Sequence, residues 1–369
     1  MDNKGKNLQG QDAPPRVEMG NSGQDRKESF MVVKAATITE KGMKRFKEAR
    51  DKGSDFLAGR QRPDGSFQNV HLGAGGYWGI PIALFVGGHS NASNRLCDWV
   101  RKNAFTPEGD IGPAPEKDRG YEYPYLKSWL IEGTHRLAQF DLSQRGMDFL
   151  AGFWDPESGG FFSSPMERGP ETKMDLWVTS GCARAALYTG RLDIARGAAR
   201  WMKKMLELQP NYPRQLFSVY SKAKGLYTEP DPGEEDFRYV LNQDATRDQS
   251  FFHPGIIGGF LARLYQSTGE EEYLELAKEY MRLAEGASDY LFRLLRAGKT
   301  GWAAAVLYTI TGEQKYKDMA VRVGDNLIAL QSEDGYWSGI GEITETPDEN
   351  MSAEMVVWLD EIYQAVGHE

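Results

Sequence analysis

The chain has 369 residues, 40% hydrophobic and 26% charged, a composition typical of globular proteins. Its formal net charge is −9 and it has no cluster of Lys and Arg, so nucleic acid is not an expected partner. Two cysteines, Cys97 and Cys182, are too few for a disulfide framework or a Cys-rich zinc site. A reducing, cytoplasmic location is therefore expected.

The first 34 residues differ in composition from the rest. They are rich in Gly, Asn, Gln, Asp and Lys and have no apolar core, which predicts a disordered tail and not a signal peptide. Residues 35–369 are predicted to form a single domain. No apolar run in the chain is long enough to cross a bilayer, so no membrane span is expected.

Two kinds of helix alternate along the domain. Amphipathic helices, with one wet face and hence expected on the outside, are predicted at 40–59, 90–104, 142–154, 192–208, 270–286 and 313–330. Helices that are apolar on most sides, and hence expected to be buried, are predicted at 78–87, 124–138, 176–189, 251–266, 299–311 and 351–366.

The connections between these helices are unequal. Short turns leave the apolar helices, whereas long aromatic connections lead into them, and the longest is the insertion at about 209–250. Three long connections begin with a similar sequence that contains Phe67, Phe161 or Tyr336. These residues are separated by 94 and 175 residues, which correspond to about two and four repeats of roughly 45 residues each. Six helical hairpins of this kind predict an all-α (α/α)6 toroid, a closed double ring. An open solenoid that binds a protein is the alternative.

The pattern resembles the (α/α)6 toroid superfamily: terpenoid cyclases, six-hairpin glycoside hydrolases and the N-acylglucosamine 2-epimerase group. WDPESGGFF at 154–162 and FHPG at 252–255 resemble segments of the epimerase group. QSEDGYW at 331–337 and MSAEMVVW at 351–358 resemble the last hairpin of unsaturated glucuronyl hydrolases, and the first of these also resembles the Gln-Trp repeats of squalene-type cyclases.

The chain departs from each of these families at the residues that carry their chemistry. The epimerases place a Glu in the helical turn after His-Pro-Gly, where this chain has Ile256 to Gly259. The Asp-x-Asp-Asp acid of squalene-type cyclases and the Asp-Asp-x-x-Asp magnesium cluster of terpene synthases do not occur in the sequence. Cys97 and Cys182 have no suitable His neighbours for a zinc site. We therefore expect neither a metal nor another cofactor.

The long connections and the starts of the apolar helices are predicted to meet at one mouth of the ring. Partial positive charge at helix starts favours anionic or electron-rich groups there. The residues expected to bind a small-molecule substrate are Trp78, Tyr121, Tyr125, Lys127, Trp129, Trp177, Tyr227, Gln249, Phe251, Phe252, Trp302, Trp337 and Trp358. Packing at the helix starts is the alternative role for these residues.

Four residues are candidates for acid–base chemistry. His253 has a side chain whose ordinary pKa lies near neutrality, and Tyr123 could donate a proton. Asp175 is also a good N-cap, and Glu354 interrupts an apolar helix face. Deeper in the same helices, Glu132, His135, Arg184 and Arg263 are expected to form buried ion pairs.

These features predict a cofactor-independent cyclase or isomerase for a largely apolar small molecule, such as a polyene or terpenoid-derived intermediate of specialised metabolism. A cycloaddition steered by the shape of the site is one form of this chemistry. The alternatives are a carbohydrate-active enzyme (a sugar epimerase, uronyl hydrolase or lyase) and a non-catalytic binding or scaffold toroid. Many convergent charged and amide groups would favour a sugar. The insertion is a candidate lid over the site or, alternatively, a contact between two copies of the chain in a homodimer.

Overall fold

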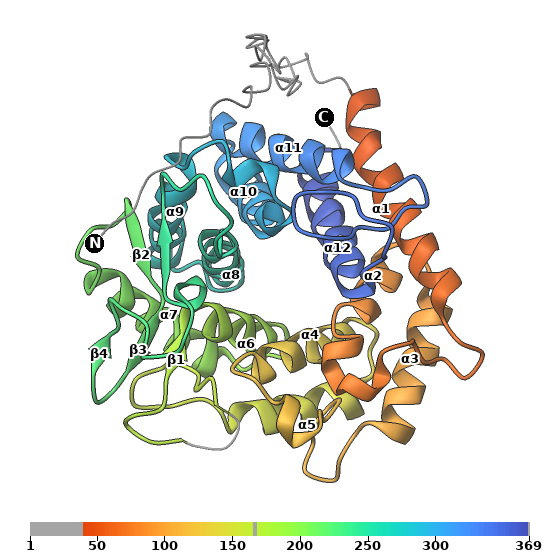
Figure 1. Ribbon diagram of the computed structural model, residues 1–369, viewed down its shortest axis with the longest axis horizontal. Coiled ribbons are helices and arrows are strands. Elements are labelled where there is room, and N and C mark those ends of the chain that lie inside the picture. Colours follow the sequence, from red (N-terminus) through yellow and green to blue (C-terminus); the bar gives the residue numbers. More distant parts are fainter. Residues whose placement is uncertain (1–39, 165–167, 368–369) are drawn as a thin grey trace, which may run out of the picture. The chain divides into compact units, whose positions relative to one another are not determined.

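The computed structural model describes residues 40–164 and 168–367, which belong to one compact unit. Twelve α-helices alternate between an inner and an outer ring (Figure 1). The predicted tail at residues 1–34 lies outside the described residues, so the division into tail and domain stays a prediction.

The helices agree with the sequence-based ranges to within a few residues at each end. The outer helices are α1 (Glu40–Arg60), α3 (Ser90–Asn103), α5 (Phe140–Ala151), α7 (Leu192–Glu207), α9 (Glu271–Glu285) and α11 (Gln314–Ala329). The inner helices are α2 (Ile80–Val86), α4 (Tyr123–Arg136), α6 (Leu176–Tyr188), α8 (His253–Thr268), α10 (Gly298–Thr311) and α12 (Glu349–Val366). Helix α2 is the shortest and is flanked by glycines, Gly79 and Gly87.

The inner helices close into a ring because each one packs against two inner neighbours. Contacts run in chain order from α2 to α12, and α12 then packs on α2 and on α1. Each inner helix therefore has its sides buried as well as the face toward the outer ring, which explains why its sequence is apolar nearly all round. The chain is an (α/α)6 toroid. The open solenoid is excluded by the contact between the last and first hairpins.

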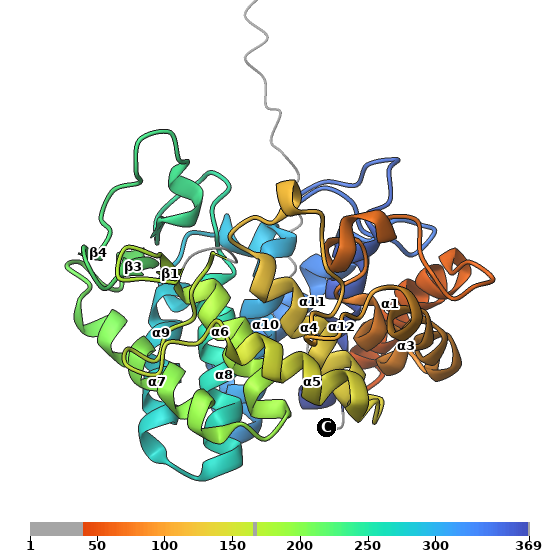
Figure 2. The same ribbon diagram turned by 90° about the horizontal axis from the view of Figure 1, so that it is seen from below.

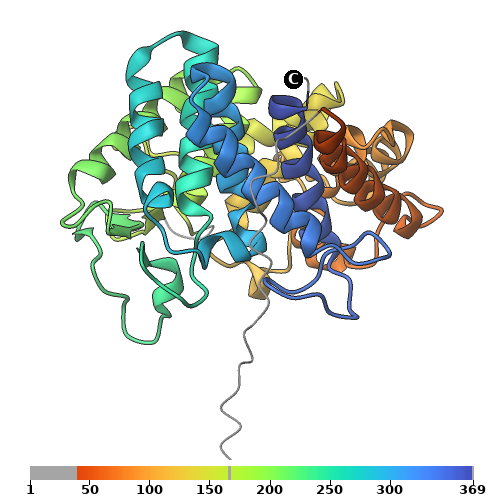
Figure 3. The same cartoon turned by 90° about the horizontal axis from the view of Figure 1, so that it is seen from above.

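All the long connections gather at one end of the ring, the end at which the inner helices begin (Figures 2 and 3). They contain short 3-10 helices: η1 (Val70–Gly76), η2 (Glu116–Asp118), η3 (Asp236–Arg238), η4 (Leu291–Arg293) and η5 (Leu295–Ala297). We call this end the mouth.

The repeated openings of three long connections have a common geometry. Gly65, Gly159 and Gly335 have φ angles of 91°, 92° and 95°, a left-handed conformation that favours glycine. A Cβ atom on any of them would lie within 2.6 Å of a backbone carbonyl oxygen of an outer helix, at 2.6, 2.1 and 2.6 Å. The glycines therefore let each connection pack tightly on the outer ring, which accounts for the spacing seen in the sequence.

The insertion between α7 and α8 contains four short strands that were not predicted from the sequence: β2 (Gln215–Phe217), β3 (Val219–Ser221), β4 (Gly225–Leu226) and β5 (Val240–Asn242). A fifth strand, β1 (Met174–Asp175), lies before α6. The order β1-β3-β4 is antiparallel, and β2 pairs with β5. Because β1 directly precedes α6, this pairing fastens the insertion to the mouth. Its role as a lid or a dimer contact stays a prediction. No helix among the described residues is long and apolar enough to span a membrane.

Candidate functional site

Eight of the predicted substrate-binding aromatics form one connected group at the mouth end of the ring axis. We call it the aromatic cluster; its members are Trp78, Tyr121, Tyr125, Trp129, Trp177, Phe252, Trp302 and Trp358. Ring centroids of successive members lie between 4.6 and 6.5 Å apart. Five inner helices (α4, α6, α8, α10 and α12) and the loops that precede α2 and α4 contribute to it, so only the closed ring can assemble the cluster. Trp78, Tyr121 and Trp177 remain partly exposed and form its accessible face.

Glycines on the inner helices make room for the buried members of the cluster. A Cβ on Gly181 would lie 2.4 Å from the ring of Tyr125, and one on Gly259 would lie 2.4 Å from the ring of Trp302. The departure from the epimerase pattern after His-Pro-Gly thus has a structural meaning. A larger side chain at position 259 would collide with Trp302, whose indole fills part of the axis.

A chain of ion pairs lies beneath the cluster. Glu132 contacts Arg184 at 2.7 Å and Arg136 at 2.9 Å, while Glu361 pairs with Arg136 and Arg263. The Arg184 guanidinium also lies 4.2 Å from the ring centroid of Trp129. The predicted ion pairs are therefore present: that between Glu132 and Arg184 is buried, whereas Arg263 is partly exposed.

His135 is a correction, because it is outside this network. Its Nδ1 lies 3.1 Å from the Ser143 hydroxyl, and its ring packs on Phe140. The helical spacing that places Glu132 and Arg136 toward the axis turns His135 toward α5.

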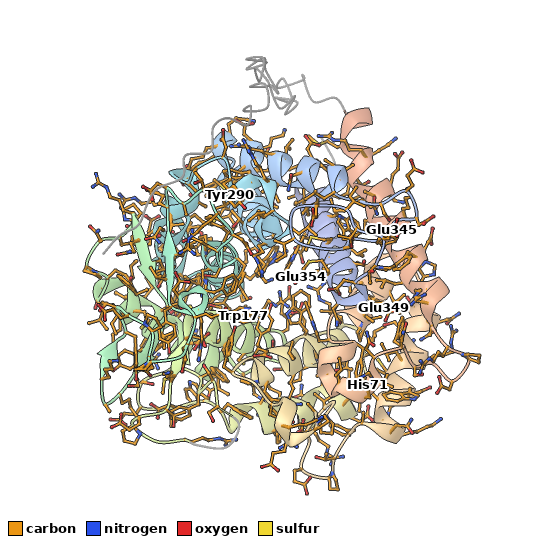
Figure 4. All side chains as sticks on the ribbon, viewed as in Figure 1. His71, Trp177, Tyr290, Glu345, Glu349 and Glu354 are labelled. Atoms are coloured by element: carbon orange, nitrogen blue, oxygen red, sulfur yellow. The ribbon has the colours of Figure 1, made fainter. Side chains whose placement is uncertain are left out.

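A second ion pair, between Lys299 and Glu354, lies beside the aromatic cluster. Both residues are nearly buried, with 5% and 8% of their surfaces exposed, and Lys299 Nζ donates to Glu354 Oε1. The same carboxylate oxygen accepts a 3.0 Å hydrogen bond from Trp358 Nε1. Glu354 and Trp177 lie close to the centre of the ring, on different inner helices (Figure 4).

His253 is the first residue of α8 and is 2% exposed. Its Nδ1 lies 2.9 Å from the Ser250 carbonyl oxygen, and because a carbonyl only accepts, Nδ1 carries the hydrogen and Nε2 the lone pair. Burial lowers the pKa of His253 to about 4; the Ser250 carbonyl and Asp175 oppose this shift and Lys299 adds to it. The imidazole is therefore neutral at physiological pH, and it stacks on the ring of Phe252 at 4.8 Å.

Asp175 forms the N-cap of α6 and holds the insertion in place. Its Oδ1 accepts from the backbone N–H of Val178 at 2.7 Å, and its Oδ2 accepts from Ser163 and from Arg238 of the insertion, at 2.7 and 2.9 Å. The Arg238 guanidinium also covers the ring of Tyr121 at 4.2 Å. Asp175 thus has both oxygens engaged, and its capping role is present.

Tyr123 and Lys127 lie outside the aromatic cluster and form a separate group around Asp110. Tyr123 donates to one Asp110 oxygen at 2.5 Å, and Lys127 Nζ lies 2.5 Å from the other. Lys127 also donates to the carbonyls of Ile111 and Gly112. Burial lowers the pKa of Lys127 to about 8, although Asp110 acts in the opposite direction. The predicted acid role of Tyr123 finds no support in this position.

Four other predicted residues are also placed away from the cluster. Trp337 is buried against α1, with its Nε1 donating to the Leu327 carbonyl at 2.7 Å. Phe251 packs on Tyr290, Tyr227 packs on Tyr239 within the insertion, and Gln249 bonds the backbone of Asn242. Residues in irregular loops have no periodicity that reveals which way they face, so the sequence could not show that these four lie apart from the cluster. Their role in binding stays a prediction.

Lys299 and Arg238 are neighbours of the cluster that the sequence analysis missed. Lys299 is a charged residue near the start of the apolar segment GKTGWAAAVLYTI, the same signal that pointed to Glu354. Arg238 lies in the insertion, where no pattern distinguishes it from other surface cations. Among residues 40–164 and 168–367, no group of three His, Cys, Asp or Glu side chains is placed to hold a metal ion.

One cavity, of about 320 Å3, lies at the turn that leaves α2 and is lined by Gly88, His89 and Arg95 among others, away from the aromatic cluster. Another, of about 170 Å3, lies at the mouth, next to the start of α4.

No protein-family model and no curated protein sequence matches the chain. Solved structures do match. D-mannose isomerase aligns with a TM-score of 0.64 at 14% identity, over 88% of this chain and 98% of that one. A sugar epimerase from a ruminal bacterium has a TM-score of 0.61 at 12% identity (87% and 99% covered). The α-1,6-mannanase GH76A of Salegentibacter sp. HEL1_6 has 0.59 at 13% identity (87% and 99% covered). These likenesses agree with the toroid fold.

Proposed function

We propose that the protein is an enzyme that isomerises or epimerises sugars by moving a proton at the carbon beside a carbonyl group. The observation that carries this proposal is the neutral, buried His253 next to the Lys299–Glu354 ion pair, at the edge of the aromatic cluster. A base, a cation and an aromatic face are the three parts that such chemistry requires.

The polarity of the site favours a sugar over the apolar substrate that we expected from the sequence. Polar groups converge on the cluster from four inner helices and from the insertion: the charged Asp175, Arg238, Lys299 and Glu354, and the neutral His253. The partly exposed Trp and Tyr rings offer flat apolar faces on which the C–H face of a sugar ring can stack. The fold likeness to D-mannose isomerase and to a sugar epimerase supports the same choice.

In the proposed reaction, Nε2 of His253 takes the proton from C2 of an open-chain aldose. The electron pair of the broken C–H bond moves to the carbonyl oxygen, and the Lys299 ammonium group stabilises the resulting enediolate. Return of the proton to C1 gives the ketose, provided that the hydroxyl proton of O2 passes to O1 in the intermediate. Rotation of the intermediate about its C2–C3 bond before the proton returns to C2 presents the opposite face of C2 and gives the epimer. The proton count is unchanged over the cycle.

Hydrolysis is less favoured because glycosidases use a pair of carboxyl groups as acid and as nucleophile or base. The two carboxylates nearest the cluster are already engaged. Asp175 has bonds on both oxygens, and Glu354 is held by Lys299 and Trp358.

The experiment that tests the proposal follows aldoses in D2O by proton NMR. Mannose, glucose and N-acetylated hexosamines are incubated with the wild-type protein, and we expect loss of the C2 proton signal with formation of a ketose or an epimer. His253→Gln and Lys299→Met should abolish exchange. The control His89→Gln, at the turn leaving α2, should retain it.

The pH profile gives a second readout. The kcat/KM of the wild type should fall on the acid side only near pH 4, the pKa of His253 in the free enzyme, and not near 6.5. Release of reducing sugar from glycosides without C2 exchange would refute the proposal in favour of hydrolysis. An absence of both reactions across the panel would count against a sugar enzyme altogether.

A further inference from the structure

One arginine and three tryptophans pack together at the buried base of the aromatic cluster. The guanidinium carbon of Arg184 lies 4.2 Å from the ring centroid of Trp129. Its distances to the ring centroids of Trp302 and Trp358 are 5.4 and 5.7 Å. The rings also contact one another, since the ring centroid of Trp358 lies 5.3 Å from that of Trp129 and 5.2 Å from that of Trp302. We call these four side chains the Arg184 cage.

The Arg184 cage contains hydrogen-bond donors for which the protein supplies no acceptor. Arg184 Nη2, Trp129 Nε1 and Trp302 Nε1 are buried, and none of them bonds to an atom in the described part of the chain. The third indole differs, because Trp358 Nε1 donates to Glu354. Guanidinium and indole nitrogens only donate, so the partner that the three groups require is an acceptor. Buried donors without a partner are costly, which indicates a bound acceptor.

The charges around the cage favour an anion over a neutral acceptor. Three guanidinium groups share two carboxylates, and the residues are Arg136, Arg184, Arg263, Glu132 and Glu361. Each of the four carboxylate oxygens already lies against one of these arginines, so none remains for Arg184 Nη2. Three positive and two negative charges leave a surplus of one positive charge. The ion pair beside the cluster is balanced and does not change this surplus.

The cage admits only a small ion. Trp129 has 0% of its surface exposed, and Trp302 and Trp358 have 1% each, so the packed rings exclude larger molecules. Arg184 is 3% exposed, and a space at least the size of a water molecule therefore adjoins it. A monovalent ion suits such a site, because the cost of taking an ion out of water rises steeply with its charge. The positive edges of the indole rings add to the attraction.

We propose that the Arg184 cage is a binding site for one monovalent inorganic anion of the size of chloride. Arg184 Nη2 and the indole N–H groups of Trp129 and Trp302 donate to the anion. The bound anion balances the surplus charge and holds these rings of the aromatic cluster in place from below. The site does not depend on the proposed sugar chemistry.

Chloride is tested as a ligand that stabilises the full chain. Thermal unfolding is followed by circular dichroism while sodium chloride replaces sodium gluconate at constant ionic strength, since gluconate is too large for the cage. A ligand that binds only the folded protein raises Tm with the logarithm of 1 + [L]/Kd. Chloride at about one hundred times its Kd should raise Tm by roughly 4 °C in a domain of this size. Bromide should act in the same way.

Arg184→Met should remove the chloride effect. The substitution leaves two guanidinium groups opposite two carboxylates, so the network is balanced and the protein is expected to fold. Arg196→Met is the matched control, because it removes the same charge from a partly exposed ion pair with Glu270 on the outer ring. The Tm of this control should respond to chloride as the wild type does.

The indole donors are tested with variants that keep an aromatic ring. Trp302→Phe removes one N–H group and should raise the Kd fitted to the chloride titration about tenfold, as expected for the loss of a hydrogen bond to a charged group. Trp201→Phe is the control. The Trp201 indole is equally buried and also has no acceptor among the described residues, but it lies on the outer helix α7. Its substitution should leave the Kd unchanged.

A crystal soaked in sodium bromide locates the anion directly. An anomalous peak is expected beside Arg184 Nη2 in the wild type and not in Arg184→Met. The inference is overturned if chloride and gluconate give the same Tm, if Arg184→Met responds to chloride as strongly as wild type, or if the wild-type cage contains no bromide. Water would then be the acceptor. If Arg184→Met does not fold, the Trp302→Phe titration and the bromide soak of the wild type decide the question.

Discussion

Replacing His253 by Gln should change how the stability of the protein depends on pH. The substitution removes the titrating group while keeping an N–H that can donate to the Ser250 carbonyl. In the unfolded chain the imidazole has its ordinary pKa of 6.5, whereas burial lowers the pKa to about 4 in the folded protein. Between these values the unfolded chain binds a proton that the folded protein does not, so acid favours unfolding.

The magnitude follows from the difference between the two pKa values. The contribution of His253 is fully present above about pH 6.5 and is lost as the pH falls toward 4. At about 1.4 kcal/mol per unit, the loss is about 2 kcal/mol near pH 5 and about 3 kcal/mol once the pH is below 4. The His253→Gln variant has no such loss.

Urea unfolding, followed by tryptophan fluorescence and circular dichroism at several pH values between 8 and 5, measures the effect. The difference in free energy of unfolding between wild type and His253→Gln should shift by about 2 kcal/mol across this range, in favour of the variant at low pH. Ile256→Val, a buried and non-titrating change on the same helix, should lower stability by about 1 kcal/mol at every pH. If the free energies of unfolding of wild type and His253→Gln differ by the same amount at pH 8 and at pH 5, the reasoning is refuted.

Three further outcomes are expected. Gly259→Ala places a Cβ 2.4 Å from Trp302 and should lower the free energy of unfolding by about 1–3 kcal/mol in the same urea assay; an unchanged midpoint would contradict it. Lys299→Met or Glu354→Leu alone should each cost about 3–5 kcal/mol and the double variant clearly less, since each single change leaves one buried charge unpaired; additive losses would argue against the pair. Burial raises the pKa of the Cys97 thiol to about 12, so an aromatic disulfide reagent at pH 8 should label it only after unfolding; rapid labelling of the folded protein would show that the site is open.

The ring could be predicted from the sequence because the distribution of apolar residues around each helix shows whether that helix is inner or outer. Apolar residues on all sides of segments such as 299–311, beside amphipathic segments such as 313–330, identify inner and outer helices without any tertiary information. The closing contact between α12 and α1 is not visible in this pattern. It followed from counting six hairpins, and the structure contains it.

The site was only partly predictable, and the reason is local geometry. Residues on the inner helices, such as Trp129, Trp177 and Trp358, lie together in the aromatic cluster because a helix fixes their directions. Their role in binding a substrate stays a prediction. Trp337 and Tyr227 lie in loops, where the direction of a side chain depends on which partner its turn meets. Pairing partners that are distant in sequence, such as Arg238 for Asp175, have no local signature at all.

Closure of the ring between its first and last hairpins has a consequence for the order of folding. Trp358 is the shared neighbour of Trp129 and Trp302, and α12 is also the helix that packs on α1 and α2. During synthesis, α1 therefore has to wait for its main partner until residues 349–366 have left the ribosome. We therefore expect the early hairpins to form as local units and the aromatic cluster to be completed only when the last hairpin packs on the first.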